Sequence, residues 1–88
     1  MRFYLDLGDK NLINVDDIVC ILDYNNAIEI EEEKNLVLNY KKNASIINLT
    51  KDSQARSLVL TSGKDGKVIY KTSFSSKRLK EKLQERIM

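Results

Sequence analysis

The residue types that most often carry out catalysis are scarce in this chain. It has no histidine and a single cysteine, Cys20, which excludes a histidine general base and a zinc site built from cysteines and histidines. Cys20 lies inside a continuous apolar run, which favours a small buried side chain over a nucleophile. We therefore expect no catalytic residue and a protein that is not an enzyme.

Two acidic clusters have the residue types of a metal or carboxylate site. Asp16 and Asp17 are adjacent, so on a strand they would point to opposite faces, and a solvated turn is the favoured interpretation. Residues 31–33 are all glutamate and could collect a divalent cation, but they also suit the first turn of a helix, whose dipole stabilises negative charge. The three glycines form no phosphate-binding motif. We expect neither a metal nor a cofactor.

Basic residues are the remaining groups with possible chemistry, because phosphate binding needs several cations on one surface. Residues 1–40 carry three basic and nine acidic residues, a net charge of −6, whereas residues 41–88 carry twelve and four, a net charge of +8. A chain with this asymmetry can bind a polyanion through its basic half. It can also bind copies of itself, acidic surface against basic surface.

Four basic residues are the candidates for nucleic-acid binding. Lys51 and Arg56 flank a polar loop, and Lys77 and Arg78 begin the last predicted helix. The alternative is that these are ordinary solubilising side chains of a charged surface. Few aromatic residues are interleaved with them, so stacking on single strands is weakly supported. Other cations of this half include Lys64, Lys67, Lys71, Lys80, Lys82 and Arg86.

The chain is expected to form one domain, residues 1–88. A domain of this length buries only about 60–65% of the surface that its unfolded chain exposes, so self-association would add stability. No apolar stretch is long enough to span a membrane, and the first residues do not resemble a signal peptide. We therefore expect no membrane partner and a cytoplasmic location.

Alternating and β-branched residues predict a sheet of short strands. Residues 18–22 form the most continuous apolar run, so the strand that contains them is expected to be the most buried, and Val19→Asp is expected to unfold the protein. Gly63 to Gly66 separate two β-rich runs, which is the clearest hairpin signal. Predicted strands cover residues 3–7, 12–15, 18–24, 45–50, 56–62 and 67–73.

Helical periodicity predicts two helices. One covers residues 27–43, capped by Asn25 or Asn26, with Leu38 on the wrong face for a core. Its predicted core face holds Ile30, Leu36, Val37, Tyr40 and Ala44. The other runs from a serine cap at Ser75 or Ser76 to about residue 87, with an apolar stripe of Leu79, Leu83 and Ile87. The predicted class is α+β: a mostly antiparallel sheet with a middle helix and a C-terminal helix.

The order of these motifs resembles a known family. Leu5-Asp6-Leu7-Gly8, residues 17–24, residues 56–61, Ile69-Tyr70 and the Ser-Phe-Ser-Ser run 73–76 are similar to the RemA/RemB regulators of bacterial extracellular matrix, with the RemB-like branch closer. The resemblance implies a cytoplasmic homo-oligomer, a ring in RemA-type members, that binds DNA and controls biofilm matrix genes. It matches Arg56 to a basic residue of the family. RemA-like proteins have arginines where this chain has Asp17, Ser53 and Gln54.

Two functions remain open on the sequence. The first is a homo-oligomeric DNA-binding regulator that recognises phosphates and duplex shape; the positive second half and the resemblance favour it. The second is a self-assembling interaction module without nucleic-acid binding, which the acidic first half and the three missing arginines favour.

Overall fold

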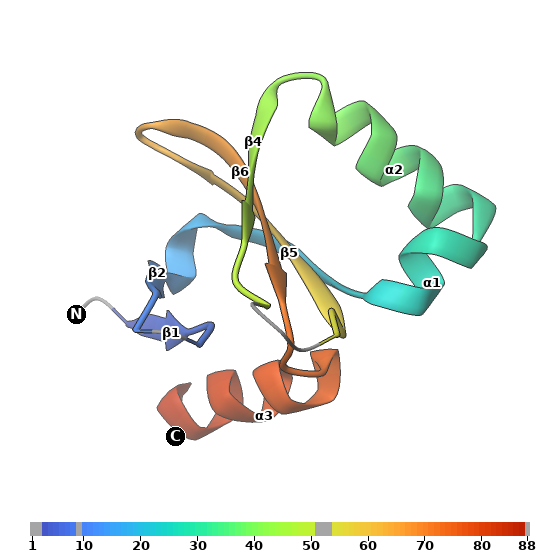
Figure 1. Ribbon diagram of the computed structural model, residues 1–88. Coiled ribbons are helices and arrows are strands. Elements are labelled where there is room, and N and C mark those ends of the chain that lie inside the picture. The colour runs from blue at the N-terminus through green and yellow to red at the C-terminus, as the bar shows by residue number, and fades with distance from the viewer. Residues whose placement is uncertain (1–2, 9, 51–53, 88) are drawn as a thin grey trace.

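The computed structural model describes residues 3–8, 10–50 and 54–87. Its strands are β1 (Tyr4–Asp6), β2 (Leu12–Asn14), β3 (Ile18–Asp23), β4 (Ala44–Asn48), β5 (Ser57–Gly63) and β6 (Gly66–Thr72). A four-stranded sheet with the order β3-β5-β6-β4 forms the centre, and β1 and β2 form a separate antiparallel pair (Figure 1). β5 is antiparallel to both of its neighbours, whereas β4 runs parallel to β6.

Two layers cover the two faces of the central sheet, so the domain has three layers (Figure 1). The helices are α1 (Tyr24–Glu29), α2 (Glu31–Lys41) and α3 (Ser76–Ile87), and a 3-10 turn, η1 (Val15–Asp17), precedes β3. α1 and α2 cover one face over a core of Ala27, Val37, Leu58, Leu60 and Ile69. α3 and the β1–β2 pair cover the other face over a core of Leu5, Leu7, Ile13, Val59 and Leu79. The predicted α+β class with a mostly antiparallel sheet is confirmed.

The β5–β6 hairpin was predicted from its glycines and is confirmed. Gly63 pairs with Gly66, so the turn consists of Lys64 and Asp65. Gly66 has a φ of 107°, a backbone conformation that glycine adopts without steric cost and that other residues rarely adopt. The turn fixes the register of the two central strands along their whole length.

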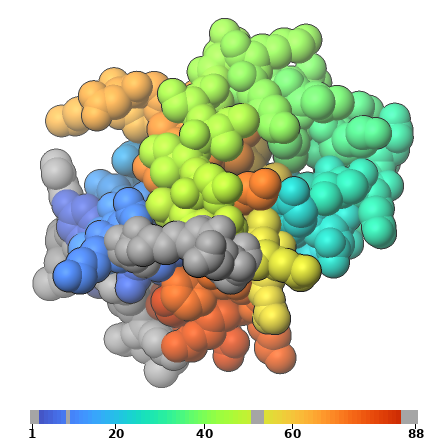
Figure 2. Space-filling model, in the orientation of Figure 1, coloured from blue at the N-terminus to red at the C-terminus, as the bar shows by residue number. Residues whose placement is uncertain are grey.

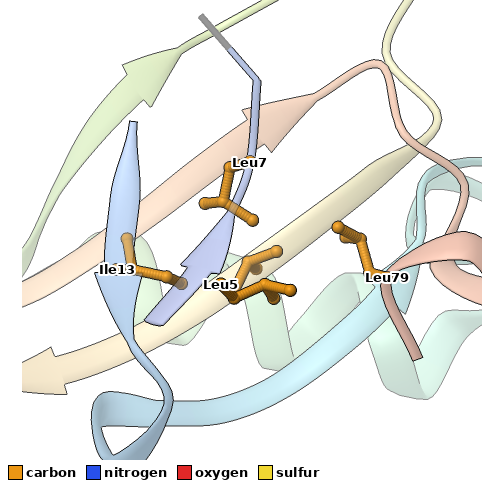
Figure 3. Packing of buried hydrophobic residues seen from close by; sticks show 5 residues of the cluster. Leu5, Leu7, Ile13 and Leu79 are labelled. Carbon is orange, nitrogen blue, oxygen red and sulfur yellow. The ribbon is translucent and has the colours of Figure 1, made fainter. Parts of the chain in front are cut away.

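β5 is the most buried strand of the sheet. Five successive residues, Ser57 to Thr61, are buried. Successive side chains of a strand point to opposite faces, so Val59 enters the core under α3 while Leu58 and Leu60 enter the core under α1 and α2. Figure 3 shows Leu5, Leu7 and Ile13 pointing from the β1–β2 pair toward Leu79 of α3.

The expectation that residues 18–22 form the most buried strand is wrong. β3 is an edge strand of the sheet, and Val19 is 58% exposed. The register shifts between Ile18, opposite Thr61, and Cys20, opposite Leu60, so Val19 is the extra residue of a β-bulge. β-branched residues favour a strand, but the place of that strand in the sheet is set by contacts with segments distant in the sequence.

The predicted helix over residues 27–43 is two helices. Ile30 is extended, with φ −83° and ψ 119°, and separates α1 from α2. The cap of α1 is Asp23, whose side chain accepts the Asn26 N–H at 3.1 Å, and not Asn25 or Asn26. Val37 is buried and Tyr40 half-buried, as expected, but Ile30 and Leu36 are exposed and Ala44 belongs to β4.

α3 begins and ends as predicted from its serine cap and apolar stripe. The Ser75 side chain accepts the backbone N–H of Arg78 at 3.1 Å, which is an N-cap contact. Leu79, one turn into the helix, is fully buried against Leu5 and Val59. Among the helices of the described residues, none combines the length and the apolar character that crossing a bilayer requires.

A pair of identical substitutions tests the corrected positions of the two valines. Val59→Asp places an unpaired charge in a fully buried position, so we expect a chain that does not fold cooperatively. Val19→Asp adds a charge to a side chain that already faces solvent, so we expect a free energy of unfolding within about 1 kcal/mol of the parent value. Urea denaturation followed by circular dichroism measures both. Equal destabilisation of the two variants would contradict the edge position of β3.

Candidate nucleic-acid interface

Arg56 stands where the chain enters β5. Its backbone N–H donates to the Thr72 carbonyl at 2.9 Å, and its carbonyl accepts the Tyr24 N–H at 2.9 Å. The backbone of Arg56 is therefore held between the end of β6 and the start of α1, while its side chain is exposed. A fixed backbone with an exposed guanidinium suits recognition of phosphate oxygens.

The first turn of α3 lies beside the start of β5 (Figure 1). The buried Ser57 hydroxyl donates to the Phe74 carbonyl at 2.6 Å, which ties the residue after Arg56 to the segment that leads into α3. Lys77 and Arg78 are both exposed on this turn. The structure therefore brings Arg56, Lys77 and Arg78 to one end of the domain, which we call the cationic end. The fourth candidate, Lys51, lies outside the described residues.

The charges of this turn are opposite to those that a helix N-terminus favours. The first turn of α3 contains no acidic residue, and it carries Lys77 and Arg78. The N-terminal end of a helix has a partial positive charge, so cations there are unfavourable for the helix itself and favourable for a bound anion. The carboxylate of Asp23 also lies near the start of β5, because Asp23 pairs with Ser57 in the sheet. This carboxylate accepts the Asn26 N–H as the N-cap of α1.

Three other cations of the second half pack on aromatic rings. The Lys67 ammonium lies 5.2 Å from the centre of the Tyr40 ring, and the Lys71 ammonium lies 5.2 Å from that of Tyr24. The Lys82 ammonium lies 3.7 Å from the centre of a third ring, that of Phe74. These lysines pack on aromatic faces of their own chain, which stabilises the fold. Lys64 is exposed at the tip of the β5–β6 hairpin, and Lys80 is exposed on α3.

The positions where the resemblance expects arginines are spread over the domain. Asp17 lies against the hairpin tip, where a Cβ added to Gly63 would be 2.9 Å from its Oδ2 atom. That tip is about 23 Å along β5 from Arg56, at about 3.3 Å per residue. Gln54 is exposed and lines a polar hollow with Asn25 and Thr50, and Ser53 lies outside the described residues. Asp17 is therefore not part of the cationic end.

Among the titratable groups of the described residues, Cys20 and Tyr40 have shifted pKa values. Burial raises the pKa of the Cys20 thiol above its ordinary value of 9.0, and the charge of Glu33 raises it further. Burial also raises the pKa of Tyr40, whose hydroxyl donates to the Thr61 carbonyl. A raised pKa keeps the thiol protonated at neutral pH, and a protonated thiol is a poor nucleophile. In the described part of the chain, no three cysteine or carboxylate side chains form a group that could hold a metal ion.

Sequence reasoning missed Ser57 and Thr72, the hydroxyl residues that position the cationic end. Both are fully buried, and the Thr72 hydroxyl donates to the Leu7 carbonyl at 2.8 Å. The sequence does contain a signal for these two residues: each places a hydroxyl group at an end of an apolar strand, where a buried polar group without a hydrogen-bond partner would be costly.

The fold and this site define a small three-layer α+β domain with a cationic end formed by β5 and α3. The profile of the RemA-like family, described as extracellular matrix regulatory protein A-like, matches residues 4–87. The chain therefore belongs to the RemA-like family, a family named for regulation and not for an enzymatic activity. No curated protein matches the chain.

The raised pKa values predict how stability depends on alkaline pH. Both groups hold their proton more tightly in the folded chain than in the unfolded chain, so their contribution is fully present below about pH 9 and is lost as the pH rises through the folded-state values. We expect the free energy of unfolding to fall above about pH 9. We also expect the fall to be shallower in a Cys20→Ala, Tyr40→Phe double variant. Urea denaturation at a series of pH values measures this, and an unchanged slope in the double variant would contradict it.

Proposed function

We propose that this RemA-like chain is a cytoplasmic DNA-binding regulator of extracellular-matrix and biofilm gene expression. It acts as a homo-oligomer, needs no cofactor and has a regulatory and not a catalytic role. It recognises the phosphates and the shape of double-stranded DNA and does not read base edges. The name of the family supports the regulatory role. The mode of DNA binding rests on the cationic end of the domain.

The observation that carries the proposal is that the start of β5, preceded by Arg56, lies beside the first turn of α3, which carries Lys77 and Arg78. These three exposed cations come from two elements that the Ser57–Phe74 hydrogen bond holds together. Two of them stand at the positive end of a helix dipole, where a phosphate would balance the accumulated charge. Lys51 is the fourth proposed contact on the basis of the sequence.

Homo-oligomerisation follows from the weakness of a single site. A few phosphate contacts give low affinity at physiological salt, whereas several copies on one assembly add their contacts. The central sheet leaves β3 and β4 as edge strands, and both expose large apolar side chains, Val19 on β3 and Ile47 on β4. Exposed edges of this kind support pairing with further subunits, and a ring is one closed form.

We also propose that the chain lies nearer the RemB-like branch of the family, on the basis of the order of its motifs. Asp17 stands at the hairpin tip, far along β5 from Arg56, so its charge does not oppose a phosphate at the cationic end. In our proposal this end carries the DNA contacts that the three missing arginines would otherwise share.

The second candidate function is a self-assembling module that does not bind nucleic acid. It is supported by the exposed Val19 on the bulge of β3 and by the acidic residues Asp16 and Asp17 just before it. In that case the cationic end would meet the acidic turn of a neighbouring subunit. The two functions differ in one result. The first predicts that the chain binds DNA at low salt and that charge reversal at Arg56 removes this binding, whereas the second predicts no DNA binding.

Charge reversal tests the DNA-binding proposal. We expect Arg56→Glu, Lys77→Glu and Arg78→Glu each to weaken binding to a duplex fragment by about tenfold. Each should also lower the slope of log affinity against log salt concentration by about one, because a phosphate contact is lost. Fluorescence anisotropy at several salt concentrations measures both quantities.

The matched control is Lys64→Glu, which reverses an exposed cation at the hairpin tip and should leave DNA affinity close to that of the parent chain. Thermal melting checks that every variant is folded. A parent chain that does not bind DNA at low salt, or whose affinity does not respond to salt, would refute the DNA-binding function. If that chain still forms an oligomer by light scattering, the self-assembling module is the remaining function.

A further inference from the structure

A groove lies between the helical layer and the central sheet, on the face opposite α3. α1 and α2 form one wall, β4 forms the other, and residues of β5 and β6 form the floor. Its volume is about 350 Å³. In Figure 2 the surface is hollowed between the lime-green strand β4 and the green and cyan helices. This volume falls at the lower end of the range for small-molecule sites, about 300–1,000 Å³.

The floor of the groove and the lower part of its helical wall are apolar and well packed. Leu58 and Ile69 come from the sheet and Ala27 and Val37 from the helices, and all four are buried members of one core. Such residues do not rearrange freely, since protein interiors are close-packed. The groove is therefore a preformed apolar depression over this core.

Exposed apolar side chains form the upper walls. Ile28 of α1, Leu38 of α2 and Ile46 of β4 each expose about half of their surface and line the groove. The helical periodicity of the sequence placed Leu38 away from the predicted core face. In the structure Leu38 lies among the apolar side chains that line the groove.

The charged residues of the groove are all cations. α1 and α2 carry four glutamates, none of which lines it, whereas both lysines of α2, Lys34 and Lys41, do. These two lysines are seven residues apart, two helical turns or about 10 Å, with Val37 and Leu38 between them. Lys71 is the third cation, and its ammonium stacks 5.2 Å from the centre of the Tyr24 ring, which also lines the groove.

We propose that this groove binds a single-chain carboxylate amphiphile of medium length, of the fatty-acid class. Its apolar chain lies over Leu58 and Ile69, and its carboxylate pairs with the lysine ammonium groups at the rim. Eleven residues line the groove, fewer than the roughly 20–30 that each partner contributes to a standard protein–protein interface. The small lining and the one-signed charge favour this ligand over a second copy of the chain. The proposal is independent of DNA binding.

Titration with decanoate, followed by amide chemical shifts of the full chain, tests the proposal. We expect saturation of one site, with the largest shifts in α2 and β4. Affinity should rise about fourfold for each buried methylene added from hexanoate to decanoate. Nonyltrimethylammonium, which has the same nine-carbon alkyl tail and the opposite charge, should bind more weakly. Equal binding of the two amphiphiles, or shifts spread over the whole domain, would overturn the proposal.

Two matched pairs of variants locate the site. Leu38→Gln should weaken decanoate binding about tenfold, whereas Leu36→Gln should not, although the two side chains lie on one helix and are 49% and 44% exposed. Lys34→Gln and Lys41→Gln should each weaken it about two- to fivefold, whereas Lys42→Gln, outside the groove, should not. If Leu38→Gln instead changes the oligomer mass and leaves decanoate affinity unchanged, the groove is a subunit contact and the proposal fails.

Discussion

The buried hydroxyl of Thr72 is the interaction on which the arrangement of the domain depends. It donates to the Leu7 carbonyl at 2.8 Å and accepts the Phe74 N–H at 3.2 Å, and the side chain is fully buried. Leaving either backbone group unpaired in the interior would cost about 1–3 kcal/mol. One side chain therefore joins the end of β1, the end of β6 and the approach to α3. Because of this junction, the first turn of α3 meets the start of β5.

Features with a local cause were predictable from the sequence, and features set by distant contacts were not. The β5–β6 hairpin follows from Gly66 and the start of α3 from Ser75, since each signal acts within a few residues. The run around Val19 predicts a strand correctly, but its edge position depends on which strand pairs with β5. The single extended residue Ile30 resets the helical phase, which is why Leu36 faces solvent and Leu38 faces the groove.

In the candidate site too, the residue types were predictable from the sequence, whereas their arrangement in space was not. The sequence identifies Arg56, Lys77 and Arg78 as candidates by type, and their common end of the domain depends on the Ser57–Phe74 contact between residues 17 positions apart. The charge of the second half is divided between this end and lysines that pack on aromatic rings. Net charge counts both groups alike, so it could not tell which cations lie at one end of the domain.

The junction at Thr72 also constrains the order in which the chain can fold during its synthesis. Leu7 and Thr72 are separated by 65 positions, and Leu5 of the β1–β2 pair is buried with Leu79. A nascent chain that has emerged as far as α2 therefore holds an apolar N-terminal segment without the β5 and α3 residues, Val59 and Leu79, that complete its core. Closing such a long loop slows folding, and the exposed segment has to wait for the last helix to leave the ribosome. A chaperone that shields the first strands of the growing chain would act during that interval.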